Sequence, residues 1–119
     1  MRAALPALAA LSLAASAHAQ ERGPAERQSL TELAYTLGEA HALRRVCAGP
    51  RDGAWYGRMQ ALIGVERPDA GLNRRLVEAF NAGFVSREAE FRACVPAARA
   101  AERAAAAHGR VLAKSLARP

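Results

Sequence analysis

The sequence predicts an all-α protein, a small antiparallel bundle of four helices in which the second helix is short. Three observations lead to this prediction. Apolar residues recur at helical spacing along most of the chain, no stretch alternates with the period of two that a strand requires, and the strong helix formers alanine and arginine are abundant. Because the expected helices are joined by short connections, neighbouring helices should run antiparallel.

The first 19 residues have the layout of a cleavable signal peptide. Met1-Arg2 is a short basic start, and an apolar run from Ala3 to Ala17 leads into the small-x-small site Ala17-His18-Ala19. The apolar run has 15 residues, fewer than the roughly 20 that a membrane-spanning helix needs. We therefore expect export to the periplasm, cleavage after Ala19 and no transmembrane segment in the mature chain.

The first helix is expected over residues 30–48. Residues 20–28 are polar, contain Gly23-Pro24 and show no apolar period, which predicts a flexible leader ahead of a single helical domain over residues 29–117. The stretch from Ser29 to Glu32 matches a capping box, in which the two side chains satisfy free backbone N–H groups at a helix start. Gly49-Pro50 is a typical helix end.

The other three helices are bounded by turn and cap signals. The second is expected over residues 54–65, and Asp69 is the expected N-cap of the third. The third helix carries the most regular apolar stripe, from Leu72 to Cys94, and Val95-Pro96 separates it from a fourth helix over residues 97–116. The residues of the fourth helix that should face inward are Ala98, Ala101, Ala105, Leu112 and Leu116.

The two cysteines, Cys47 and Cys94, are expected to form a structural disulfide. An even cysteine count in an exported protein is typical of disulfide bonding, and the sequence lacks the redox-active Cys-x-x-Cys pattern. Cys47 should close the first helix and Cys94 the third, so the bond should join two helix C-termini at one end of the bundle. It would close a loop of about 48 residues, for which the chain-entropy model gives about 4 kcal/mol of stabilisation.

The chain is strongly basic, with a formal net charge of +6 at pH 7. Export argues against nucleic acid as the partner and leaves an envelope protein, an anionic envelope polymer or an anionic lipid. The fourth helix places five basic side chains on one face, which would suit an anionic envelope component. The alternative interpretation is that this face is the solvated side of a bundle helix. The residues of this basic face are Arg99, Arg103, Arg110, Lys114 and Arg118.

A candidate polar pocket is expected at the second half of the first helix. His41 and Arg44 lie close to the line that should pack inward, so two chargeable groups interrupt the apolar stripe. Arg44 would bind an anionic group and His41 would donate or accept a proton, with Trp55 and Asn81 completing the candidate set. The alternative is that neither group serves a ligand. Each would then pair with a backbone carbonyl or a glutamate of the protein, or reach out to solvent. The glutamates that come into question are Glu78 and Glu90.

The sequence contains no enzyme or cofactor signature. The metalloprotease pattern His-Glu-x-x-His, the nucleophile elbow and the glycine-rich phosphate loop are all missing. With both cysteines oxidised, His41 and His108 alone do not make a zinc site, and no Cys-x-x-Cys-His motif supports haem. We therefore expect a non-enzymatic protein without a metal or a cofactor.

The chain resembles an uncharacterised alphaproteobacterial family of small exported helical proteins with two well-separated cysteines. The resemblance covers about residues 30–116 and implies an envelope or periplasmic setting, in agreement with the disulfide. It implies no activity. The residues that carry it are Leu37-Gly38, His41, Leu43-Arg44, Cys47, Trp55, Met59, Leu62, Phe80-Asn81, Gly83-Phe84 and Cys94.

These observations favour an exported, non-enzymatic module with an interaction or structural role in the cell envelope. Two alternatives stay open. One is the binding of anionic envelope components through the basic face of the last helix, and the other is a small-ligand site at His41 and Arg44.

Overall fold

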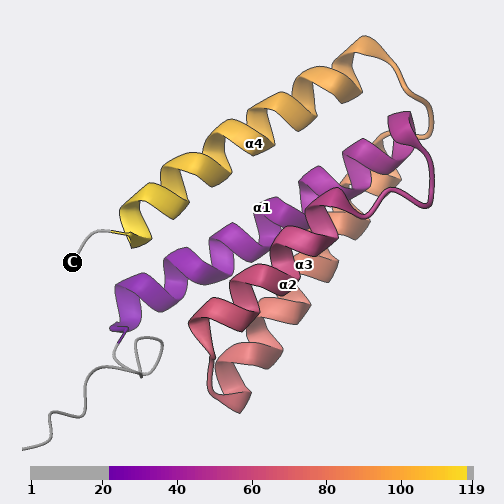
Figure 1. Ribbon diagram of the computed structural model, residues 1–119. Coiled ribbons are helices and arrows are strands. Elements are labelled where there is room, and N and C mark those ends of the chain that lie inside the picture. Colours follow the sequence, from indigo (N-terminus) through magenta and orange to yellow (C-terminus); the bar gives the residue numbers. More distant parts are fainter. Residues whose placement is uncertain (1–21, 118–119) are drawn as a thin grey trace, which may run out of the picture.

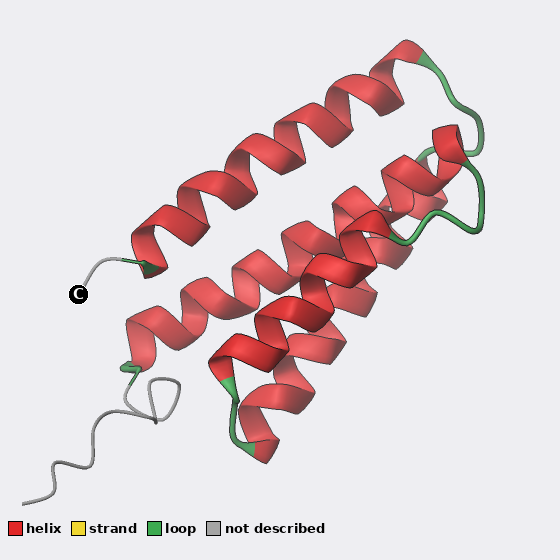
Figure 2. Cartoon of the chain, in the orientation of Figure 1, coloured by secondary structure: helices red, strands yellow, loops and turns green. Residues whose placement is uncertain are grey.

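The computed structural model describes residues 22–117, which form four helices (Figure 1). These are α1 (Pro24–Ala48), α2 (Ala54–Glu66), α3 (Ala70–Glu90) and α4 (Pro96–Leu116). Within this range no strand occurs (Figure 2), so the predicted all-α bundle is confirmed. The predicted signal peptide and Arg118 lie outside the described residues.

Helix α1 is the centre of the bundle, because it makes extensive contacts with each of the other three helices. Helices α2 and α4 both pack on α1 but barely touch each other. The core is formed where leucines of α1 meet apolar residues of the other helices, and the largest fully buried side chains are Leu30, Leu43, Leu72 and Leu76.

Helix α1 begins at Pro24, so the predicted start near residue 30 is wrong, and residues 24–28 are helical rather than a flexible leader. Gly23 is the N-cap, and the proline takes the first helical position, where its fixed φ and missing N–H fit. The expected capping box at Ser29 lies inside the helix. Arg27 ties this first turn to the start of α3 through Asp69, with 2.6 Å between Nη2 and Oδ2.

Helices α1 and α3 cross closely at two glycines. A Cβ atom on Gly38 would overlap the carbonyl group of Phe80, and a Cβ atom on Gly83 would overlap the carbonyl group of Tyr35. A glycine of each helix therefore packs directly against the backbone of the other helix.

Helix α3 begins as predicted, since Asp69 Oδ1 accepts a hydrogen bond from the Leu72 backbone N–H at 2.8 Å. It ends at Glu90, however, and Cys94 lies in the loop that follows. The predicted extension of α3 to Cys94 is therefore wrong. Val95 has extended φ and ψ because the helical region is disfavoured for a residue that precedes a proline. The chain also needs a few residues to turn back into α4.

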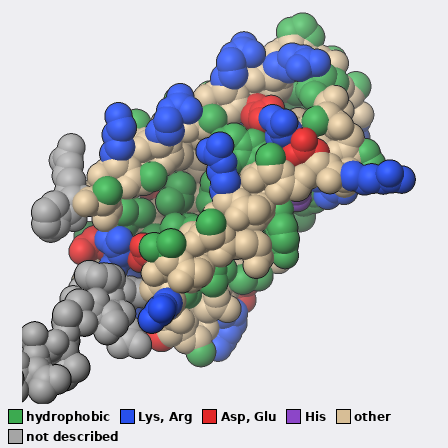
Figure 3. Space-filling view, viewed as in Figure 1, with side chains coloured by type: hydrophobic (Ala, Val, Ile, Leu, Met, Phe, Trp, Pro, Cys, Tyr) green, Lys and Arg blue, Asp and Glu red, His purple; other side chains and the backbone are tan. Residues whose placement is uncertain are grey.

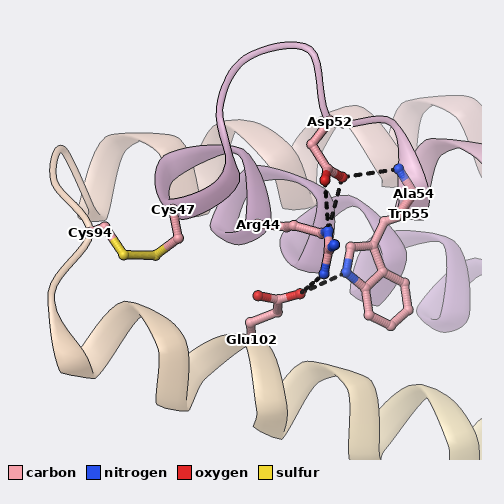
Figure 4. Close-up of polar contacts among 7 residues, drawn as sticks. All are labelled: Arg44, Cys47, Asp52, Ala54, Trp55, Cys94 and Glu102. Atoms are coloured by element: carbon pink, nitrogen blue, oxygen red, sulfur yellow. Dashed lines mark hydrogen bonds and ion pairs between the residues drawn. A yellow bond between two sulfur atoms is a disulfide. The ribbon is translucent and has the colours of Figure 1, made fainter.

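The disulfide between Cys47 and Cys94 is confirmed, with a Cα–Cα distance of 4.8 Å. Because α3 ends before Cys94, the bond joins the last turn of α1 to the α3–α4 loop rather than two helix C-termini. It still lies at one end of the bundle, as predicted (Figure 4).

Helix α4 packs on α1 through the expected side. The buried residues of α4 are Ala98, Ala105, Leu112 and Leu116, and Ala101 is half-buried. Next to this buried side, where α4 faces α2, the helix carries the small residues Ala106, Gly109 and Ala113.

Candidate functional site

Arg44 is the centre of a polar network that joins α1, the α1–α2 turn, α2 and α4 (Figure 4). Its Nε atom lies 2.9 Å from each carboxylate oxygen of Asp52, and its Nη1 atom lies 3.7 Å from Oε2 of Glu102. Trp55 Nε1 donates to the same Glu102 oxygen at 2.9 Å. Asp52 also accepts from the backbone N–H of Ala54 at 3.1 Å.

These contacts keep the network charged. The Ala54 N–H and then the Arg44 guanidinium lower the pKa of Asp52, because both stabilise its carboxylate. The hydrogen bond to Asp52 raises the pKa of Arg44. Arg44 is thus paired with two carboxylates of the protein itself. The partners expected from the sequence are not the ones used, since Glu90 binds Arg87 and Glu78 is exposed.

His41 lies apart from this network, in an aromatic cluster. Its ring centroid is 5.3 Å from that of Phe84, 5.7 Å from that of Phe80 and 6.0 Å from that of Tyr56. Its Nδ1 atom is buried and has no hydrogen-bond partner within the described part of the chain. Burial, followed by the nearby charge of Arg45, lowers the pKa of His41 and so favours the neutral form of its ring.

The structure therefore brings together two of the four candidate pocket residues. Arg44 and Trp55 meet at Glu102, whereas His41 is among aromatic rings and Asn81 is exposed on α3. A small-ligand site at His41 and Arg44 stays a prediction.

The basic face of α4 is exposed as expected. Arg99, Arg103, Arg110 and Lys114 all face solvent, and Figure 3 shows basic side chains along α4. None of these four forms an ion pair with a carboxylate among residues 22–117.

An open apolar groove of about 400 Å³ lies between α2 and α4, with α1 as its floor. Figure 3 shows it as a hollow with hydrophobic side chains, flanked by basic ones. Its floor consists of Leu33 and Leu37, its α2 wall includes Leu62 and Val65, and its α4 wall includes Ala106, Gly109 and Ala113.

Two polar links join α2 to α4, one near each end of α2. At the first end, Trp55 of α2 donates to Glu102 of α4. At the other end, Arg22 donates to both carboxylate oxygens of Glu66 at 2.7 and 3.0 Å and to the carbonyl oxygen of Leu116 at 3.1 Å. Apart from these links the two helices have few contacts with each other, and both rest on α1 with the groove between them.

Sequence reasoning missed this groove. A signal for it exists, because Ala106, Gly109 and Ala113 form a stripe of small residues at spacings of three and four, beside the inward-facing stripe of α4. The stripe does not reveal which other helix forms the opposite wall of the groove. Only the placement of α2 on α1 shows that these small residues face an open space.

The fold and the groove define a small all-α domain with one disulfide, built on a central helix. The chain matches the family model described as a protein of unknown function, DUF2385, over residues 24–118, and so it belongs to that family. This confirms the resemblance seen in the sequence at the level of a family of unknown function. No curated protein and no solved structure matches the chain.

Two features are absent from the described residues. No helix among them is both long and apolar enough to cross a membrane. In the same range, no three His, Cys, Asp or Glu side chains are grouped so that they could hold a metal ion.

Proposed function

We propose that this member of DUF2385 is an exported, non-enzymatic helical module of the cell envelope that works by binding a partner in the α2–α4 groove. The observation that carries the proposal is the groove itself. It is apolar, open to solvent, and held between two helices that are linked at both ends. Pockets of a few hundred Å³ that are lined mainly by apolar groups are typical ligand sites.

Two features support export. The layout of residues 1–19 is that of a signal peptide. A disulfide such as Cys47–Cys94 is typical of oxidising compartments, because cytosolic reductants keep thiols reduced.

Export is tested by the intact mass of the protein recovered from the periplasmic fraction of its native host, without reductant. We expect a chain that begins at Gln20 and gains the mass of two hydrogens when it is reduced. Recovery of a chain that begins at Met1 in the cytoplasm, with two free thiols, would contradict the proposal.

Binding in the groove is tested by photo-crosslinking in cells, with a benzophenone amino acid placed at one position at a time. Val65 and Ala113 line the groove and are exposed, so probes there should form adducts with an envelope component. A probe at Ala104, exposed on the same α4 helix but outside the groove, is the matched control. Equal adduct formation at all three positions, or none, would count against a groove partner.

The exposed arginines of α4 favour a second candidate function, the binding of anionic envelope components through the basic face. Arg99 and Arg103 belong to this face but do not line the groove, so they separate the two functions. Co-sedimentation with anionic vesicles should weaken as salt rises and as both residues are changed to Gln. Unchanged co-sedimentation of the double variant would eliminate this candidate.

A further inference from the structure

The shape of the α2–α4 groove limits what it can hold. The groove is an open trough of about 400 Å³. Along α2 its lining residues extend from Trp55 to Val65, about 15 Å at 1.5 Å per residue. A long, thin apolar group, such as a single alkyl chain, fits these dimensions.

The charge of the groove limits the occupant further. No acidic side chain lines it, and its two charged residues are both arginines, Arg58 on the α2 wall and Arg110 on the α4 wall. Both are exposed, and neither forms an ion pair with a carboxylate in the part of the chain that the structure describes. The Arg58 guanidinium lies 4.6 Å from the ring centroid of Trp55, a stacking contact that leaves its charge available. An apolar trough with arginines on both walls complements an apolar chain that carries an anion.

We infer that the groove binds a single-chain anionic amphiphile of the fatty-acid type, as a monomer, with its chain along Leu33 and Leu37 and its anionic head between Arg58 and Arg110. This inference rests on the proposed groove function and names the class of its ligand. Binding removes the chain from water on an apolar floor, and the arginines select the sign of the head group.

Trp55 makes the inference measurable, because it is the only tryptophan of the chain and it lines the groove. The mature, oxidised protein is titrated with laurate below its micelle concentration, while the Trp55 emission is recorded. We expect saturable binding with a blue shift. Octanoate should bind more weakly, since each methylene that is buried raises affinity about fourfold. Dodecyltrimethylammonium, which has a chain of the same length and the opposite charge, should bind at least about fivefold more weakly than laurate.

Two pairs of variants locate the chain and the head. Ala113→Leu fills the groove from an exposed helical position, so laurate affinity should fall at least about tenfold, whereas Ala104→Leu outside the groove should bind as the parent does. Arg110→Gln should weaken laurate about threefold without weakening dodecyltrimethylammonium, and Arg103→Gln should change neither. Far-UV circular dichroism checks that each variant is folded.

The inference would be overturned by the absence of saturable laurate binding, by equal affinity for the cationic amphiphile, or by full laurate binding of folded Ala113→Leu. A Trp55 shift caused by anionic phospholipid vesicles but not by monomeric laurate would also overturn it, in favour of a membrane surface. Crosslinks at Val65 and Ala113 together with a failed laurate titration would reject the ligand class and retain the groove function. Absence of both would reject the groove function as well.

Discussion

At the scale of single residues, the buried charge of Glu66 shows how this small protein uses polar groups. Glu66 is 6% exposed and ends α2. It is matched by the bidentate guanidinium of Arg22, which also holds the last carbonyl of α4, so three parts of the chain meet at one ion pair. A carboxylate this buried needs such a partner, because an unpaired charge in the interior is strongly unfavourable.

We predict that Glu66→Gln lowers the free energy of unfolding by about 2 kcal/mol, because Arg22 then keeps a partly buried charge without its counter-ion. Urea denaturation followed by circular dichroism measures the change. Glu78→Gln, an exposed carboxylate on α3 that forms no ion pair among the described residues, is the control and should stay within about 0.5 kcal/mol. Equal effects of the two changes would contradict the assignment of a structural role to Glu66.

His41 predicts a pH dependence of stability. Burial lowers its pKa in the folded protein below the ordinary value of 6.5, so the unfolded chain binds a proton more readily than the folded chain. The free energy of unfolding should therefore be highest above pH 6.5 and fall as the pH drops through this value toward the lower folded-state pKa. Nearby Asp52 opposes this effect and Arg45 strengthens it. Denaturation at pH 7.5 and 5.5 should show a smaller loss for His41→Gln than for the parent, and parallel losses would contradict the prediction.

At the scale of elements, the crossing of α1 and α3 depends on two glycines that give up helix propensity for a close backbone approach. Alanine is more favourable than glycine in a helix by about 1 kcal/mol. At Gly38 and Gly83 a methyl group would meet a backbone carbonyl, which cannot move aside as a flexible side chain can. The same type of substitution should thus have opposite signs at different helical glycines.

We predict that Gly83→Ala lowers the free energy of unfolding by about 3 kcal/mol, because α1 and α3 must separate to admit the methyl group. Gly64→Ala is the matched control. An added Cβ at Gly64 meets no atom within 4 Å, so this change should raise stability by about 0.5–1 kcal/mol. Thermal unfolding of both variants gives the comparison, and destabilisation of similar size at both positions would contradict the crossing geometry.

At the scale of the whole molecule, the disulfide holds together the end of the bundle at which α1 and the α3–α4 loop meet. A domain of this size buries a limited core, and several of the buried core residues are alanines, which contribute little apolar area each. One cross-link that restricts the conformations of the unfolded chain then contributes a large part of the total stability.

We predict that removal of the disulfide lowers the free energy of unfolding by about 4 kcal/mol, the chain-entropy value for a loop of this length. Denaturation of the oxidised protein with and without reductant measures the loss. The Cys47→Ser, Cys94→Ser double variant should match the reduced protein and show no response to reductant. An unchanged midpoint after full reduction would contradict this role.

Much of the fold follows from local signals. The helical periodicity, the Asp69 cap and the Val95-Pro96 boundary each depend on residues within one turn of each other, and all three are found in the structure. At each of the two wrongly predicted boundaries, one local signal prevailed over another. A proline at the first helical position started α1 earlier than the capping box, and the turn into α4 ended α3 before Cys94.

The candidate site follows from contacts between residues that are far apart in the chain. Trp55 contacts Glu102, and Arg22 contacts Glu66, although each pair is separated by more than 40 positions in the sequence. Arg44 pairs with Asp52 and Glu102 rather than with the glutamates expected from the sequence. Which carboxylate reaches which arginine depends on how the helices pack, and helical periodicity carries no such information.

The amino-acid sequence alone was sufficient for the helical class, the pairing of the cysteines and the exposed basic side of α4, because propensity, periodicity and cysteine count act without knowledge of neighbours. Tertiary packing alone decided that α2 and α4 rest on α1 without closing on each other. The groove exists because the small residues of α4 face α2 while both helices rest on α1, and a distance between two helices is a property of the assembled bundle.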